Sequence, residues 1–135
     1  MFLDASAIIA MLGDEAEGDL FSDALAAASN PITSPIAVWE AVAGLVKEYA
    51  LSVTEARAKV ALFLRAAKVG SVSIGEPERE IALDAYDQFG KGRHPARLNM
   101  GDCFAYAAAK TNDAPILHKD HGFYRTDLKS ALGPA

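Results

Sequence analysis

Apolar and polar positions alternate along the chain in blocks that predict short strands followed by helices. The first block, residues 1–11, is apolar except for Asp4 and Ser6. A run this short predicts a buried strand that passes directly into a helix, with Ser6 as a candidate N-cap. Asp4 would then lie at the carboxyl end of a central strand, where open α/β sheets place their ligands. Burying an unpaired carboxylate costs free energy, so a buried Asp4 needs backbone donors, a cation or a metal beside it. A role as a simple helix cap would explain an acid at this position equally well.

The next blocks predict two helices separated by a short strand. A helix is expected over 14–28, and its acids crowd the first half, where the helix dipole favours them. Residues 32–33 read as a strand, after which Ser34 and Pro35 start a second helix as N-cap and first residue. Its apolar positions recur at helical spacing and predict a core face. They are Ile36, Trp39, Val42, Ala43 and Val46. Glu40 lies off that face, among small residues.

The second half of the chain continues the alternation. Residues 52–55 form a capping box that opens a helix to about residue 68. Residues 69–74 alternate as a strand, and a helix follows that ends at Gly90. Residues 103–109 carry no charge, which predicts a helix buried nearly all round, with Asp102 at its start. Residues 115–117 form a last buried strand, and Asp120 follows it.

Composition narrows the class of protein. The chain has 135 residues, a hydrophobic fraction of 51% and one cysteine, which fits a single domain without a disulfide framework. We therefore expect a cytoplasmic protein. No apolar run approaches the roughly 20 residues that span a bilayer, so no membrane association is expected.

Charge is distributed unevenly. The formal net charge of -5 argues against a generic nucleic-acid binder. Residues 88–101 nevertheless contain no acid and include Lys91, Arg93 and Arg97, with His94 beside them. This loop is a candidate for contacts with phosphates, although scattered surface charge would give the same pattern.

Four of the 18 acids stand apart from the polar clusters. Asp4, Glu40 and Asp102 have apolar or small neighbours, and Asp120 ends a predicted strand. Each alone could be structural. Together, carboxylates in one place need a cation, and Mg²⁺ or Mn²⁺ suits all-oxygen ligands. No His and Cys set has zinc-ligand spacing.

Four segments, in order, resemble the PIN-domain ribonucleases of the VapC toxin type. They are Phe2-Leu3-Asp4-Ala5-Ser6-Ala7, Trp39-Glu40-Ala41, residues 90–104 with Asn99-Met100-Gly101-Asp102, and residues 117–128. One departure is clear. The closing segment of that family usually reads Lys-Gly-x-Asp-Phe, whereas here Gly122 precedes Phe123 and Asp120 stands at the usual Gly position. The fourth carboxylate is therefore displaced to Asp120, replaced by His121, or absent.

The resemblance implies one PIN-like domain over residues 1–135, folded as a three-layer α/β/α sandwich with a mostly parallel central sheet. It also implies a Mg²⁺-dependent endoribonuclease, in which Mn²⁺ can substitute, leaving 5′-phosphate and 3′-hydroxyl ends. Asp4, Glu40 and Asp102 would be the catalytic acids and metal ligands, with Asp120 as a further ligand. The implied partners are RNA, a small cognate antitoxin and a second copy of the chain.

Other classes of protein share parts of this residue pattern. A metal-free ribonuclease could use His94, His118 and His121, and would be insensitive to EDTA. A receiver domain needs a second acid beside Asp4, and an Asp-x-Asp phosphatase needs an acid where Ser6 stands, so both fit poorly. A PIN-fold module that binds RNA or antitoxin without turnover is the non-enzymatic alternative.

Overall fold

A fully parallel four-stranded sheet forms the centre of the computed structural model, which describes residues 1–134. The strands are β1 (Phe2–Leu3), β2 (Ile32–Thr33), β3 (Gly70–Ser71) and β4 (Ile116–Leu117), in the order β3-β2-β1-β4. Parallel strands require crossover connections, and helices supply each of them here.

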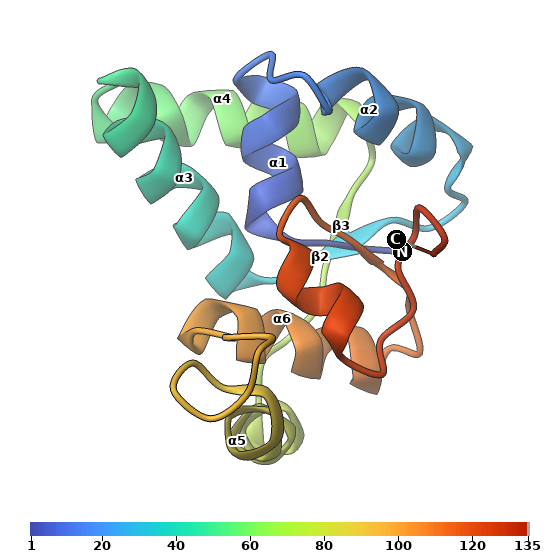
Figure 1. Ribbon diagram of the computed structural model, residues 1–135. Coiled ribbons are helices and arrows are strands. Elements are labelled where there is room, and N and C mark those ends of the chain that lie inside the picture. Colours follow the sequence, from blue (N-terminus) through green and yellow to red (C-terminus); the bar gives the residue numbers. More distant parts are fainter. Residues whose placement is uncertain (135) are drawn as a thin grey trace.

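Helices cover both faces of this sheet (Figure 1). They are α1 (Ala5–Leu12), α2 (Gly18–Ala27), α3 (Pro35–Tyr49), α4 (Val53–Ala66), α5 (Glu76–Phe89) and α6 (Met100–Thr111), with a 3₁₀ helix η1 (His121–Arg125) near the end. The first four lie on one side of the sheet, and α5 and α6 lie on the other (Figure 1). The predicted three-layer α/β/α sandwich is confirmed.

The two-residue strands build two separate cores. Side chains alternate between the faces of a strand, so β1 and β4 each give one side chain to each layer. Phe2 and Ile116 pack with α5 and α6, whereas Leu3 and Leu117 pack with α1 to α4. The predicted buried helix is α6, whose residues 105–109 are all buried.

The core face of α3 differs from the prediction. Ala37, Ala41 and Leu45 are buried, whereas Trp39 is 71% exposed. The helical period was right but the face was wrong, because α3 is apolar on two sides and the smaller side chains allow the closer approach. Gly44, on the inner side, lies directly against Ile9 of α1. This rotation turns Glu40 toward the interior rather than toward solvent.

Several element boundaries also differ. The helix predicted from residue 14 begins at Gly18, because Asp14 adopts a left-handed φ of 52°. The strand predicted over 69–74 is paired only at Gly70–Ser71. Gly90 follows α5 with a φ of -68°, so it ends the helix without the left-handed conformation of a glycine cap. The capping box at residues 52–55 is confirmed. None of the helices within residues 1–134 has the length and apolar character needed to cross a bilayer.

Candidate active site

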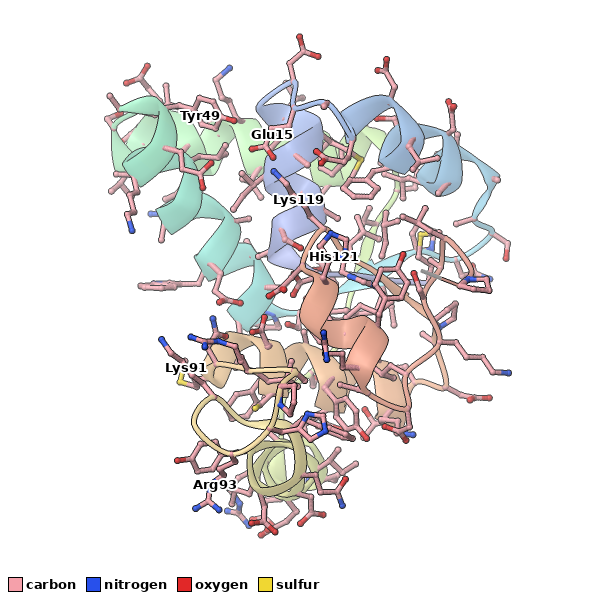
Figure 2. All side chains as sticks on the ribbon, viewed as in Figure 1. Glu15, Tyr49, Lys91, Arg93, Lys119 and His121 are labelled. Carbon is pink, nitrogen blue, oxygen red and sulfur yellow. The ribbon has the colours of Figure 1, made fainter. Side chains whose placement is uncertain are left out.

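Four acidic residues lie where the carboxyl ends of the strands meet. Asp4 directly follows β1, and Asp120 follows β4 after two residues. Glu40 is in the second turn of α3, the helix that leaves β2, and Asp102 is in the first turn of α6. Lys119 and His121 of the closing segment, labelled in Figure 2, lie beside α1 at this edge. The parallel topology therefore brings together acids that are up to 116 positions apart in the printed sequence.

Asp4 is both the N-cap of α1 and a buried carboxylate. Its Oδ2 accepts hydrogen bonds from the backbone N of Ser6 at 3.1 Å and from Ser6 Oγ at 2.5 Å. Ser6, expected to cap the helix, instead donates to the residue that caps it. Burial raises the pKa of Asp4, the Ser6 hydrogen bonds lower it, and the charge of Asp120 raises it further. Asp4 therefore caps α1, and the same carboxylate lies in the acidic cluster.

Asp102 is oriented by a reciprocal capping box. Its Oδ2 accepts from the backbone N of Asn99 at 3.0 Å, and Asn99 Oδ1 accepts from the backbone N of Asp102 at 2.8 Å. The residue is 8% exposed. Burial raises the pKa of Asp102 to about 7, and the charges of Asp4, Asp120 and Glu40 contribute to this rise. Asp102 thus stabilises its helix while its charge belongs to the acidic cluster.

Glu40 is half-buried and is the least constrained of the three central acids. Burial raises the pKa of Glu40 to about 7, the charge of Asp4 adds to the rise, and no hydrogen bond from the described residues opposes it. Its carboxylate lies over the Cα of Gly101, so closely that a β-carbon at position 101 would collide with it. Because Gly101 has no side chain, Glu40 can approach Asp102 at the start of α6.

The donor set fits a hard divalent cation in its chemistry. All four groups are carboxylates, and each of the central three is disfavoured as an anion by burial and by its neighbours. Within residues 1–134, no three His, Cys, Asp or Glu side chains are arranged to enclose a metal ion directly. Asp4 and Asp102 are held in their positions by the hydrogen bonds at the starts of their own helices. Metal-bound waters commonly complete such sites for Mg²⁺.

The closing segment contains Asp120 and a buried histidine. Asp120 is exposed and caps η1, with Oδ1 accepting from Gly122 N at 3.0 Å. His118 is buried against the rings of Phe123 and Tyr124, and its Nδ1 donates to the Asp120 carbonyl at 2.6 Å. Its Nε2 has no partner among the described residues. Burial lowers the pKa of His118, which keeps the ring neutral.

The three basic residues of the 88–101 loop are not equivalent. Arg93 contacts Asp87 at 3.4 Å and lies over the ring of Tyr86 at 5.1 Å. Figure 2 shows Arg93 beside α5, away from Lys119 and His121. Lys91 lines a surface pocket together with Asn99 and Met100, next to the turn that holds Asp102. Arg97 is exposed and has a left-handed φ of 56°.

One group of contacts had no signal in the sequence. Lys119 Nζ pairs with Glu15 Oε1 at 2.5 Å, and Glu15 Oε2 accepts from Tyr49 Oη at 3.0 Å (Figure 2). The backbone N of Lys119 donates to Ser6 Oγ at 3.0 Å. The two contacts of Lys119 join the closing segment to α1 and to the loop that follows it. Each spans more than 100 positions of the sequence, beyond any local pattern.

The chain matches a family of known proteins over nearly its whole length. The family described as "PIN domain" matches residues 1–129. Ribonuclease VapC30 of Mycobacterium tuberculosis is 36% identical over 134 residues, covering 99% of this chain and 100% of that protein. Ribonuclease VapC of Mycolicibacterium smegmatis is 35% identical over 128 residues, covering 95% and 97%.

Two solved structures share the fold. Mycobacterium tuberculosis VapC20, described as a toxin that cleaves the sarcin–ricin loop, aligns with a TM-score of 0.73 at 16% identity, covering 94% of this chain and 95% of its own. A toxin–antitoxin complex from Klebsiella pneumoniae aligns with a TM-score of 0.66 at 15% identity, covering 90% and 88%. The chain belongs to the PIN-domain family, among its VapC ribonucleases.

Proposed function

We propose that this protein is the ribonuclease toxin of a toxin–antitoxin pair, and that it cleaves RNA with Mg²⁺ or Mn²⁺ held by Asp4, Glu40 and Asp102. Its VapC relatives are named as ribonucleases and align along nearly their whole length. Asp120 is a further ligand candidate on the closing segment.

The metal proposal rests on one observation: burial and nearby negative charges disfavour the charged form of the three central acids. Glu40 and Asp102 both have a pKa raised to about 7, chiefly by burial, and Asp4 adds to both rises. A cluster of this kind binds protons at neutral pH unless another positive charge replaces them. A divalent cation with oxygen ligands is the replacement that also serves phosphodiester chemistry.

The acidic residues would have different roles in the reaction. A bound Mg²⁺ would lower the pKa of a water and offset charge on the phosphoryl oxygens. Asp4 and Asp102 are fixed by Ser6 and by Asn99, so they are suited to hold a position. Glu40, which no hydrogen bond from the described residues holds, is suited to ligate the ion or to hold a water bound to it. Attack by water in this way leaves 5′-phosphate and 3′-hydroxyl ends.

The partners follow from the same proposal. Lys91, Arg93 and Arg97 would contact RNA phosphates, and Arg93 would first have to leave Asp87. A small antitoxin would neutralise the enzyme, as in the toxin–antitoxin complex that shares its fold. We also propose that the protein forms a homodimer and that it is located in the cytoplasm.

The decisive experiment is cleavage of end-labelled RNA by the purified protein with Mg²⁺, with Mn²⁺ and with excess EDTA, followed by analysis of the product ends. We expect cleavage with either metal and none in EDTA. Full activity in EDTA would overturn the metal proposal and favour the histidine-based mechanism. RNA binding without cleavage under all conditions would favour a PIN-fold binding module, which the altered closing segment at Asp120 and Gly122 makes the second candidate.

A further inference from the structure

A cleft of about 290 Å³ opens between α5 and the start of α6. The buried side chains of Ala82, Leu98 and Cys103 form its floor, and its exposed lining is almost entirely apolar. Two larger side chains line its walls: Leu83, which is 56% exposed, and Tyr86, which is 48% exposed. The cleft is therefore a preformed apolar recess that the described part of the chain leaves open to solvent.

The ring of Tyr86, at the wall of the cleft, is restricted by two contacts. Gly90, at the end of α5, lies so close to Tyr86 that a β-carbon at position 90 would collide with the backbone carbonyl and the ring. Arg93 lies over the ring, 5.1 Å from its centroid, and is not among the residues that line the cleft. Contacts with Gly90 and Arg93 therefore restrict a ring that still borders the cleft. An aromatic ring that is positioned in advance binds a flat partner at a small cost in conformational entropy.

Positive charge surrounds the mouth of the cleft. Arg79 and Lys91 line it, and no acid is among the described residues that do so. Arg79 pairs with Glu80 on the surface, whereas Lys91 is exposed and has no ion pair within residues 1–134. Figure 2 shows Lys91 near the start of α6 and Arg93 beside α5. In a chain with a formal net charge of -5, an apolar recess flanked by cations favours a partner that is apolar in one part and anionic in another.

We propose that this cleft binds one unpaired base of the RNA substrate, with the base stacked against Tyr86 and the adjoining phosphates at Lys91 and Arg79. A nucleotide joins a flat ring to an anionic phosphate, and proteins bind single strands by stacking bases on aromatic side chains beside cations. This base site rests on the proposed ribonuclease function, because it takes part of the same substrate.

The cleft adjoins the acidic site. Cys103, in the floor, directly follows Asp102 in the first turn of α6. Successive residues of a helix point about 100° apart, so one turn of α6 presents Asp102 to the other acids and Cys103 to the cleft. A base held in the cleft thereby limits which phosphodiester of the strand reaches Asp102. Tyr86 is a positioning residue in this arrangement, because it selects where the strand is cut and takes no part in the chemistry.

A base suits this cleft better than an apolar segment of another protein does. An apolar helix or strand that filled the recess would leave the cations at its mouth without anions. RNA brings a phosphate with every base. A second protein chain in the cleft is therefore an outcome of the test and not part of the proposal.

The first measurement is the affinity of the full chain for a short, fluorescein-labelled, mixed-sequence single-stranded RNA in EDTA, by fluorescence anisotropy. Tyr86→Ala should weaken binding about tenfold, as expected for the loss of one stacked base. Tyr86→Phe keeps the ring and should bind as the wild type does. The control is Tyr49→Ala, which removes a 39% exposed tyrosine at the end of α3 and should have no effect. Equal affinity of Tyr86→Ala and wild type would overturn the proposal.

The second measurement separates contacts with the base from contacts with phosphates. An abasic oligonucleotide, which keeps the sugar–phosphate backbone, should bind equally to wild type and to Tyr86→Ala. Lys91→Gln should reduce the log–log salt slope of RNA binding by about 0.7, the value for one phosphate contact on a single strand, whereas Tyr86→Ala should not change it. Lys59→Gln, on the exposed surface of α4, is the control. A weaker abasic complex and a smaller salt slope with Tyr86→Ala would show that the ring supports only a phosphate contact, and would overturn the base site.

The third measurement places a fluorescent reporter in the cleft. Tyr86→Trp, combined with Trp39→Phe, leaves the cleft with the one tryptophan of the chain. A stacked base should quench its emission when RNA is added, and the abasic strand should not. Emission that stays constant at RNA concentrations that saturate binding would overturn the proposal. Emission that instead changes with protein concentration, over the range in which the mass in solution doubles, would assign the cleft to a second copy and also overturn it.

The last measurement is the pattern of cuts in end-labelled RNA with Mg²⁺. Tyr86→Ala should cut at more positions than the wild type, whereas Tyr49→Ala should give the wild-type pattern. A wild type that cleaves RNA, with a Tyr86→Ala variant that binds and cuts identically, overturns the base site alone. A wild type whose RNA binding depends on Tyr86 but which never cleaves overturns the ribonuclease proposal alone. A wild type that neither binds nor cleaves RNA overturns both.

Discussion

The two sides of the acidic site are held by different means. On one side, Asp4 and Asp102 are fixed by contacts within three residues of themselves, with Ser6 and with Asn99. On the other side, Asp120 also caps its own helix, but the segment that carries it is joined to the start of the chain through Lys119, which reaches across 104 positions to Glu15. The comparison teaches that local helix capping orients Asp4 and Asp102, whereas the closing segment reaches the site through contacts that form only once the whole chain has folded.

The largest effect is expected at Asp102, on the locally built side. Asp102→Asn keeps an oxygen that can accept from Asn99 N, and asparagine is as good a capping residue as aspartate. It removes the negative charge. Cleavage of labelled RNA should fall by more than the roughly 10- to 100-fold typical for loss of a residue that only supports a metal ligand. The melting temperature in metal-free buffer should be equal or higher, because repulsion among the acids is relieved.

Wild-type cleavage by a well-folded Asp102→Asn protein would show that Asp102 only caps α6. The matched control is Asn99→Ala, which removes the other half of the capping box and keeps the charge. It should cost about 1 kcal/mol of stability while most of the cleavage survives.

The difference between local and distant contacts also explains which features the sequence could predict. Asp4, Asp102 and the buried helix α6 followed from apolar runs that surround a single acid. The parallel sheet required a resemblance to known proteins, because a two-residue strand has no period of its own. The core face of α3 was predicted wrongly, since both of its sides are apolar and only packing against α1 selects one. The role of Lys119 was not predictable, because its partners Glu15 and Ser6 are far away in the sequence.

A second prediction tests the room made by Gly101. A β-carbon at this position collides with the Glu40 carboxylate, which is the far end of a flexible side chain and can move aside, so Gly101→Ala should change the stability of the fold by less than about 1 kcal/mol. It should reduce cleavage, because Glu40 is pushed away from Asp102. Chemical denaturation and RNA cleavage measure the two quantities. Leu62→Ala, at an exposed position of α4, is the control and should change neither. A fully active Gly101→Ala protein would contradict a role for Glu40 in this position.

A third prediction concerns the pH dependence of stability without metal. The folded pKa values of Glu40 and Asp102, both about 7, lie above their ordinary values of 4.5 and 3.8. Between those ordinary values and pH 7 the folded state therefore binds more protons than the unfolded state. Its stability falls as pH rises through this window and levels off above it. Thermal melts in EDTA from pH 4 to pH 8 should show this fall in stability. The contribution of other titrating groups is measured with a variant that lacks these two acids, and is then subtracted.

That variant is the double change Glu40→Gln and Asp102→Asn, which removes these two titrating groups. Its stability should fall less with pH than that of the wild type, and the fall that remains includes the contribution of Asp4, whose pKa is also raised. Added Mg²⁺ should raise the melting temperature of the wild type at pH 8 and not that of the variant, because a ligand that binds only the folded state stabilises it. A wild-type profile no steeper than that of the variant would show that burial does not raise the pKa values of Glu40 and Asp102.

The smallest effect is expected at Lys119, on the side that depends on distant contacts. Lys119→Ala removes the ion pair with Glu15, and the Lys119 side chain is 44% exposed, so the pair is screened by solvent and contributes little. The melting temperature should therefore barely change. The contact nevertheless fastens the segment that carries Asp120, and the backbone N of residue 119 still bonds to Ser6 in the variant. Amide hydrogen exchange should accordingly rise a few-fold at residues 119–122 and stay constant at Asp102 and Asn99. Lys129→Ala, at another exposed lysine of the closing region, is the control. Equal exchange at both sides of the site would show that the closing segment needs no help from Lys119, and that the two halves are equally self-supporting.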